Sequence, residues 1–381
     1  MKTKQRLYPS ISHGAKAFCF VLLMLVTACG GQEDPIVEKE DQLQLSDKEI
    51  LISADGWKPM TESRANIFET QDDFLNEEVG GGDFTLHAFT RGSDTPFIDG
   101  TRARYFREEN GWRFYAHPNI INYYWPQTGT FDFLAYMPYK NSGKQKIINA
   151  ESISYDKNAG SVTLACSIPN TTQNVNDSTG QETVIAYSKG LSKQTVGDKV
   201  NMHFVHPFAA IYIKLIKSHR NLKITKIQFN NVYFQGKTTL SAATDTIANI
   251  DWTAQGTPGT LEIPVNKVIP NDINFGGDVG GPYLVMPQDF NIGSDKELTI
   301  TVYYIWDDAI EGNENKQEQS FTSPIKKVGT ELPDNQKIIA WKSGYKYIYN
   351  LLLGDNEAEI LFKVDVEPWD VEDYKHVIEV E

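Results

Sequence analysis

Hydrophobic residues recur at every second position over much of this chain, which is the period of a half-buried β-strand. The clearest runs are FTLHAF at Phe84–Phe89 and FDFLAY at Phe131–Tyr136. Asn110-Gly111, within Tyr105–Tyr115, predicts a hairpin turn because these residues suit positive φ angles. Runs with a helical period are hard to find, so the pattern predicts an all-β protein. Further strands are expected at Ser161–Ile168, Thr183–Tyr187, Val200–Val205, Ala209–Ile216, Leu222–Phe229, Tyr283–Val285, Leu298–Ile305, Tyr345–Leu352 and Glu359–Val366.

The turn residues between these strands favour two tandem β-sandwiches of the transthyretin-like, Greek-key type. The polar, glycine-containing stretch Lys189–Lys199 is the best candidate for a domain boundary. We therefore expect an N-terminal sandwich over residues 47–195 and a C-terminal sandwich over residues 196–381. A chain of 381 residues is long enough to build both cores.

The N-terminus has the pattern of a bacterial lipoprotein signal peptide. Basic residues precede the apolar run Ala17–Val26, which is too short to span a bilayer. Small residues then lead into Cys29, as in a lipobox, where the cysteine becomes the acylated first residue of the mature chain. We predict a signal peptide over residues 1–28, an outer-membrane anchor at a palmitate-bearing Cys29, and an acidic tether over residues 29–46. The alternative is an ordinary signal peptide with a chance cysteine.

Composition and charge restrict the partners of the chain. The residues are 40% hydrophobic and 12% aromatic, as in a globular protein, and the net charge is −14. So acidic a surface disfavours binding to nucleic acid or to anionic membranes. With Cys29 acylated, Cys166 has no partner for a disulfide, and its place in SVTLACSI predicts a buried strand residue.

Residues 47–65 combine a short strand-like run with a polar loop. The run, Glu49–Ser53, places Ile50 and Ile52 on one face and Leu51 on the other. The loop ends at Arg64, which is expected to be exposed to solvent.

Several blocks of the chain, in this order and spacing, resemble the fimbrillin family of Bacteroidales, the type V pilins. The blocks are the lipobox, Trp112, Tyr124-Trp125-Pro126, Phe131–Tyr136, Pro138, Val200–Lys214, Leu284–Gln288, Trp341, Gly344-Tyr345, Tyr347, Tyr349-Asn350-Leu351, Ile360 and Val366–Trp369. The resemblance implies two β-sandwich domains, lipoprotein export, and removal of the first strand of the N-terminal domain by an arginine-specific or trypsin-like protease. A strand from a neighbouring subunit then fills the open groove.

Carried over to this sequence, the resemblance makes residues 49–54 a lid strand and residues 55–65 a cleavage loop, cut between Arg64 and Ala65. The replacing strand would come from the tail Asp370–Glu381 of another copy. Its candidate anchors are Tyr374, Val377, Ile378 and Val380. Two alternatives remain open: Arg64 is a plain loop arginine, or the tail is the last edge strand of its own domain.

Catalytic and metal chemistry find little support in the sequence. His203 and His206 point to opposite faces of a strand, so they are poorly placed to share an ion. No serine or cysteine stands in a recognisable nucleophile elbow. We expect no enzyme activity, no catalytic residue, no metal and no cofactor.

The sequence therefore predicts a non-enzymatic fimbrial subunit that supports cell adhesion, with a stalk role favoured over a tip or an anchor. Its expected partners are copies of itself or related subunits, the processing protease, the outer membrane before processing, and an adhesion target of unknown identity. The rival prediction is a surface glycan-binding lipoprotein of a nutrient-uptake system. Its stacking platform would be Trp112, Tyr123 and Trp125, for which core packing is the alternative role. A secreted hydrolase is a remote third possibility.

Overall fold

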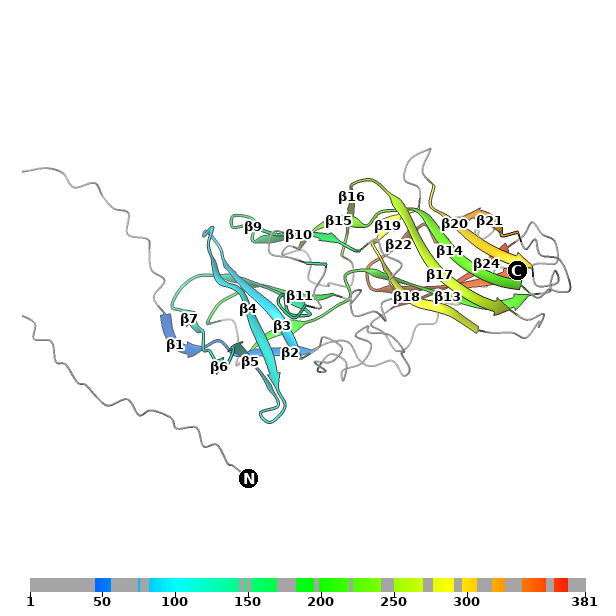
Figure 1. Cartoon of the computed structure of the whole chain (residues 1–381). Helices are drawn as coiled ribbons and strands as arrows, with labels where there is room; N and C mark the ends of the chain where they lie inside the picture. The colour runs from blue at the N-terminus through cyan, green and yellow to red at the C-terminus, as the bar shows by residue number, and fades with distance from the viewer. Residues whose placement is uncertain are drawn as a thin grey trace, which may run out of the picture. The chain divides into compact units, whose positions relative to one another are not determined.

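The computed structural model describes residues 45–55, 75, 82–143, 147–148, 152–169, 183–194, 199–218, 222–240, 250–269, 277–290, 297–306, 317–325, 338–353 and 360–368. These residues form an all-β protein of 24 strands in six sheets (Figure 1). Among them, no helix is long and apolar enough to cross a membrane.

The largest sheet has the strand order β11-β8-β3-β4-β5-β2-β12, with β6 paired to β5. Its two ends meet, because Ile185 and Val205 exchange two backbone hydrogen bonds of 3.1 and 2.9 Å. Beside it, β1 and β7 form a two-stranded sheet. The strands are β1 Leu45–Glu49, β2 Ile52–Asp55, β3 Asp83–Thr90, β4 Pro96–Phe106, β5 Gly111–Ala116, β6 Asn119–Ile120, β7 Tyr124–Pro126, β8 Phe131–Met137, β11 Val184–Leu191 and β12 Val200–His203.

The two faces of this sheet bury different clusters, as alternation along each strand requires. One face encloses an aromatic core in which Phe84 packs against Trp112 and Phe204, with ring centroids 4.8 and 5.2 Å apart. The opposite face contributes Leu134 and Tyr136 to a second cluster. That cluster is shared with a four-stranded sheet of order β16-β15-β10-β9. Its strands are β9 Ile153–Asp156, β10 Ser161–Ser167, β15 Gln235–Leu240 and β16 Thr253–Gln255.

The C-terminal half contains two four-stranded sheets that enclose a third core. Their orders are β18-β13-β23-β24 and β17-β14-β20-β21, and both contribute to one apolar cluster. In strand β14, for example, the buried residues face this cluster and alternate with polar residues on the outer face of the sheet. The strands are β13 Ala209–Ser218, β14 Leu222–Val232, β17 Gly259–Ile269, β18 Gly277–Val285, β20 Thr299–Trp306, β21 Gln319–Pro324, β23 Tyr345–Leu353 and β24 Ile360–Pro368, with a short pair β19 Gln288–Asp289 and β22 Ala340–Trp341.

The structure confirms the all-β prediction. Each predicted strand overlaps a strand of the structure, and the largest shift is at β18, which begins at Gly277 instead of Tyr283. The predicted hairpin is also present, because β4 ends at Phe106, β5 begins at Gly111 and Asn110 has a φ angle of 48°. The domain division at residues 195/196 stays a prediction. Strands β12 and β15 come after that point in the chain and pair with strands from before it.

Candidate functional site

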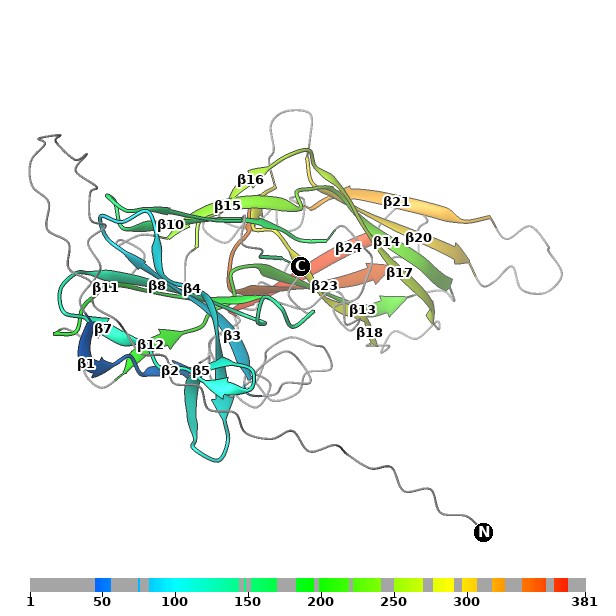
Figure 2. The ribbon, with the colours of Figure 1, turned by 60° about the vertical axis from the view of Figure 1, so that its left-hand side comes forward.

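The predicted lid residues lie in the interior of the large sheet rather than at its edge. Strand β2 pairs in parallel with β12, from Val200 opposite Ile52 to His203 opposite Asp55. On its other side it pairs antiparallel with β5, where Ile52 lies opposite Trp112. Figure 2 shows β2 beside these two strands. Strand β2 therefore joins β5 to β12 in the described sheet order.

The core-facing side of the lid is apolar, as its sequence predicts. Ile50 is 1% exposed and Ile52 is 3% exposed, and both belong to the aromatic core of the sheet. Leu51 is half-buried on the other side. The lid therefore fills an apolar slot with two branched side chains while its backbone completes the sheet.

The lid differs from the prediction in being two strands instead of one. Strand β1 pairs with β7 and ends at Glu49, and β2 starts at Ile52 after a break in the pairing. Across the break, the Ile50 N–H donates to the Tyr123 carbonyl at 2.7 Å, and the Leu51 carbonyl accepts from the Val200 N–H at 2.8 Å. The chain pairs with β7 before the break and with β5 and β12 after it. The alternation of apolar residues is the same in both cases, so the sequence pattern could not predict this change of partner strand.

Removal of β2 would open the sheet between β5 and β12. Backbone groups now bonded to β2 would lose their partners, including the Val200 N–H, and the positions of Ile50 and Ile52 would become an apolar slot. An incoming strand could restore both the hydrogen bonds and the apolar contacts.

Several predicted site residues lie outside the described part of the chain. They are Cys29, Arg64, Ala65, Tyr374, Val377, Ile378 and Val380. Their assigned roles stay predictions.

The three aromatic residues predicted to form a glycan-stacking platform, Trp112, Tyr123 and Trp125, pack in or against the protein core. Trp112 is 6% exposed and Trp125 is 1% exposed, and both pack in the aromatic core. Tyr123 is packed against the same core, with its ring 4.8 Å from that of Phe114. Core packing, the alternative role for these residues, is what the structure shows.

A salt bridge to a buried carboxylate lies at one end of the large sheet and was not predicted from the sequence. The Asp132 carboxylate is 0% exposed and accepts two hydrogen bonds from the Arg91 guanidinium, at 3.1 and 3.0 Å. It also accepts from the Tyr155 hydroxyl at 2.8 Å and from the Gly190 N–H at 2.7 Å. The hydrogen bond with Asp132 raises the pKa of Arg91. Four donor groups, two of them on Arg91, satisfy the buried charge of Asp132. The carboxylate therefore joins β8 to β9, to β11 and to the turn after β3.

Two buried histidines are held in the neutral form. Burial lowers the pKa of His87 to about 4, although Asp99, whose carboxylate lies 3.3 Å from Nδ1, acts in the opposite direction. Burial also lowers the pKa of His206 well below its usual value, and the nearby Lys346 contributes. His203 is exposed and His206 is buried, as expected for opposite faces. Within the described ranges there is no group of three or more His, Cys, Asp or Glu side chains that could hold a metal ion.

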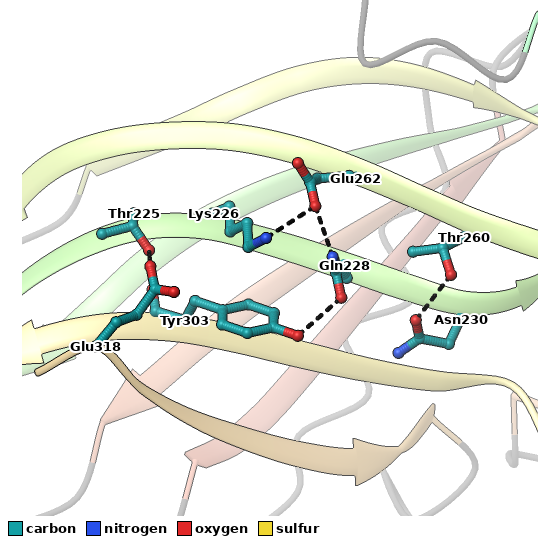
Figure 3. Close-up of polar contacts among 8 residues, drawn as sticks. All are labelled: Thr225, Lys226, Gln228, Asn230, Thr260, Glu262, Tyr303 and Glu318. Atoms are coloured by element: carbon teal, nitrogen blue, oxygen red, sulfur yellow. Dashed lines mark hydrogen bonds and ion pairs between the residues drawn. The ribbon is translucent and has the colours of Figure 1, made fainter.

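The outer face of the β17-β14-β20 sheet carries a cross-strand polar network (Figure 3). Glu262 accepts from Lys226 at 3.0 Å and from Gln228 at 2.6 Å, and the Tyr303 hydroxyl donates to Gln228 at 3.0 Å. The bond from Gln228, then that from Lys226, lowers the pKa of Glu262. These side chains bond to one another, as is typical of a stabilising sheet surface rather than a reactive centre.

The described residues form an all-β protein in which β2 lies between β5 and β12 and Ile50 and Ile52 pack in the aromatic core. A family model described as fimbrillin-like matches residues 80–369. The chain belongs to the fimbrillin-like family, which makes it a fimbrial subunit of the cell surface.

Solved structures that are similar to this chain include proteins from three Bacteroides species. A fimbrial protein from Bacteroides vulgatus is 14% identical with a TM-score of 0.53, covering 85% of this chain and 100% of its own. A putative cell adhesion protein from Bacteroides uniformis is 16% identical with a TM-score of 0.46, covering 84% of this chain and 99% of its own. One from Bacteroides ovatus is 15% identical with a TM-score of 0.46, covering 86% and 99%. No curated protein sequence matches the chain.

Proposed function

We propose that this protein is the precursor of a fimbrial stalk subunit that polymerises by strand exchange. The precursor would reach the outer membrane as a lipoprotein acylated at Cys29. A trypsin-like or arginine-specific protease would cut between Arg64 and Ala65 and release the lid. A strand from a neighbouring subunit would then enter the slot, and the filament would support adhesion.

The observation that carries this proposal is the place of β2 between β5 and β12. A strand at the edge of a sheet can leave at little cost, but one between two partners leaves two unpaired edges. Those edges and the exposed slot favour the capture of another strand. With the lid in place, the same edges are covered, which keeps the precursor from polymerising before export.

The proposed source of the replacing strand is the tail Asp370–Glu381. It follows β24, which ends at Pro368 and forms the edge of its sheet. A stalk subunit needs both a slot and a donor, whereas a tip needs only the slot and an anchor retains its lipid. The presence of a removable lid and a tail in one chain supports the stalk role.

Limited proteolysis with an arginine-specific protease tests the proposal. The chain from residue 30 onward is expected to be cut after Arg64 and then to form filaments visible by electron microscopy. The matched variant Arg64→Gln should resist the cut and remain monomeric under the same conditions. A parent chain that is cut after Arg64 yet stays monomeric would contradict the stalk assignment.

Glycan binding is a second candidate function, and a hollow in the C-terminal half favours it. The hollow has a volume of about 490 Å³, and its lining includes Trp252, Asp251, Asp289 and Lys342. An indole ring next to carboxylates is a combination that can stack on a sugar and accept its hydroxyl hydrogen bonds. Calorimetric titration of the uncut chain with polysaccharides tests this function, with Trp252→Ala as the variant that should lose binding. If no polysaccharide binds the parent, this candidate is wrong.

A further inference from the structure

The segment expected to leave with the lid covers more than the slot. Strands β1 and β2 follow one another from Leu45 to Asp55, and both precede the proposed cut after Arg64. β2 pairs with β5 and β12, whereas β1 pairs with β7. In the part of the chain that the structure describes, β1 is the one strand that pairs with β7. Departure of the lid therefore opens two edges, the slot and β7.

Strand β7 is anchored by side chains that do not depend on β1. Trp125 is 1% exposed, and the centre of its ring lies 5.9 and 5.8 Å from the ring centres of Phe131 and Phe133. The preceding residue but one, Tyr123, packs its ring 4.8 Å from that of Phe114. None of these four contacting rings belongs to the lid. We therefore expect β7 to stay in place when β1 leaves, and to offer its backbone groups to an incoming strand.

The two edges follow one another along the lid. The Ile50 N–H donates to the Tyr123 carbonyl, next to β7, at 2.7 Å, and the Leu51 carbonyl accepts from the Val200 N–H of β12 at 2.8 Å. The lid therefore passes from β7 to the slot between two consecutive residues. A segment that covers both edges, as Leu45–Asp55 does, needs about eleven residues, or about 36 Å of extended chain.

We propose that β7 is the second half of the strand-accepting site, and that residues 370–381 of a second copy occupy β7 and the slot together as one extended segment. This inference rests on the proposed function. The twelve residues of this tail can span about 40 Å, which is enough to cover both edges. A strand that filled the slot alone would leave the backbone of β7 without the partner that β1 provides.

The apolar residues of the tail set its register on the two edges. Ile378 and Val380 have the spacing of the two lid isoleucines, so they are the pair proposed for the slot. The same offset brings Val377 to the place of Glu49. Glu49 is paired opposite Tyr124, whose side chain is 37% exposed. A β-branched residue packs against an aromatic ring across two strands, whereas a carboxylate does not, so β7 favours the tail over the lid.

Competition between peptides on the clipped chain tests the proposal. The chain from residue 30 onward is cut at Arg64 and separated from its lid, and a fluorescent peptide of residues 45–55 is the probe. Binding is followed by fluorescence anisotropy. The competitors are a peptide of residues 370–381, a shorter peptide of residues 376–381 that fills the slot alone, and a matched 370–381 peptide that carries D373P and K375P. The two prolines lack the N–H groups needed to pair along β7.

The 370–381 peptide should displace the probe at a concentration on the order of tenfold lower than the short peptide or the proline-bearing peptide, because it adds backbone hydrogen bonds along β7. Hydrogen exchange at the β7 amides should slow when the 370–381 peptide is bound and should not slow with the short peptide. Protected amides between β3 and β8 show in the same experiment that the clipped chain is folded.

The remaining outcomes separate this inference from the proposed function. Equal displacement by the three competitors would overturn the role of β7 and leave the slot intact. A probe that binds but is not displaced by the 370–381 peptide would overturn the tail as the occupant. If the probe itself does not bind the folded, clipped chain, removal of the lid leaves no strand-accepting site, and the proposed strand exchange fails together with this inference.

Discussion

Replacing Ile52 by alanine should loosen the lid by an amount that the structure allows to be worked out. Ile52 is 3% exposed in the aromatic core, and Ile→Ala removes three buried carbon groups. At about 0.8 kcal/mol for each group, plus the cavity that remains, the expected cost is about 3 kcal/mol. If that cost falls on the local opening of the lid, the open population rises on the order of 100-fold.

The amide of Val200 reports this opening directly, because it donates to the Leu51 carbonyl at 2.8 Å. Hydrogen exchange of the uncut I52A variant should show faster exchange at Val200 by about two orders of magnitude. Amides between β3 and β8 exchange only through larger openings, so in both proteins they should exchange more slowly than Val200. The matched variant Leu51→Ala changes the half-buried side of the lid and should accelerate Val200 less than about tenfold. Unchanged protection at Val200 in I52A would refute the reasoning that Ile52 holds the lid in the slot.

Three further predictions concern the body of the subunit. Asp132→Asn should lower the free energy of unfolding by about 2 kcal/mol in urea titrations, because the hydrogen bonds from Arg91, Tyr155 and the Gly190 N–H lose their charged acceptor; an unchanged midpoint would contradict this. His87, with a pKa lowered to about 4, favours folding when neutral, so stability should decline as the pH falls from about 6.5 towards 4. Protonation of His87 should account for a loss of about 3 kcal/mol in the free energy of unfolding. In the His87→Gln variant this loss should be absent, and only the loss due to His206 should remain. Burial raises the pKa of Cys166 to about 12, so a disulfide reagent should modify it only after unfolding; rapid modification of the native chain would contradict its buried position.

The sequence predicted the strands whose apolar residues alternate without interruption. β3 and β8 are of this kind, and the Asn110-Gly111 turn was visible because few residues accept its backbone angles. Other strands were missed because bulges or small residues hide the period. β17 contains Pro264 and a positive φ of 49° at Asn266. These interrupt the alternation that makes a strand recognisable.

β15 was missed for a different reason. Its buried face consists of Gly236, Thr238 and Leu240, so only one large apolar residue marks it. An added Cβ at Gly236 would lie 2.5 Å from the Met286 sulfur, so a larger residue there would displace the Met286 side chain. The Thr238 hydroxyl donates to the Asp251 carbonyl at 2.8 Å and so is satisfied inside the protein. Burial of small and polar residues follows from the tertiary neighbours, which local pattern does not contain.

The candidate site was predictable only in part. Two isoleucines around a leucine indicated a strand with one apolar face, and the structure buries that face. The partner strand could not be predicted, since Ser53 and Asn201, 148 residues apart, are neighbours across β2 and β12. Local alternation fixes which face is buried but not which strand lies beside it.

Assembly with the lid locked in place tests directly whether the lid must leave the sheet before the subunits polymerise. Ser53 and Asn201 face each other in the pairing of β2 with β12, and the Ser53 hydroxyl donates to the Asn201 side chain. A disulfide between S53C and N201C would keep the lid in the slot after cleavage at Arg64. The oxidised, clipped variant is expected to stay monomeric in light scattering and to polymerise once a reductant is added. Polymerisation at the same rate in the oxidised and the reduced state would contradict it.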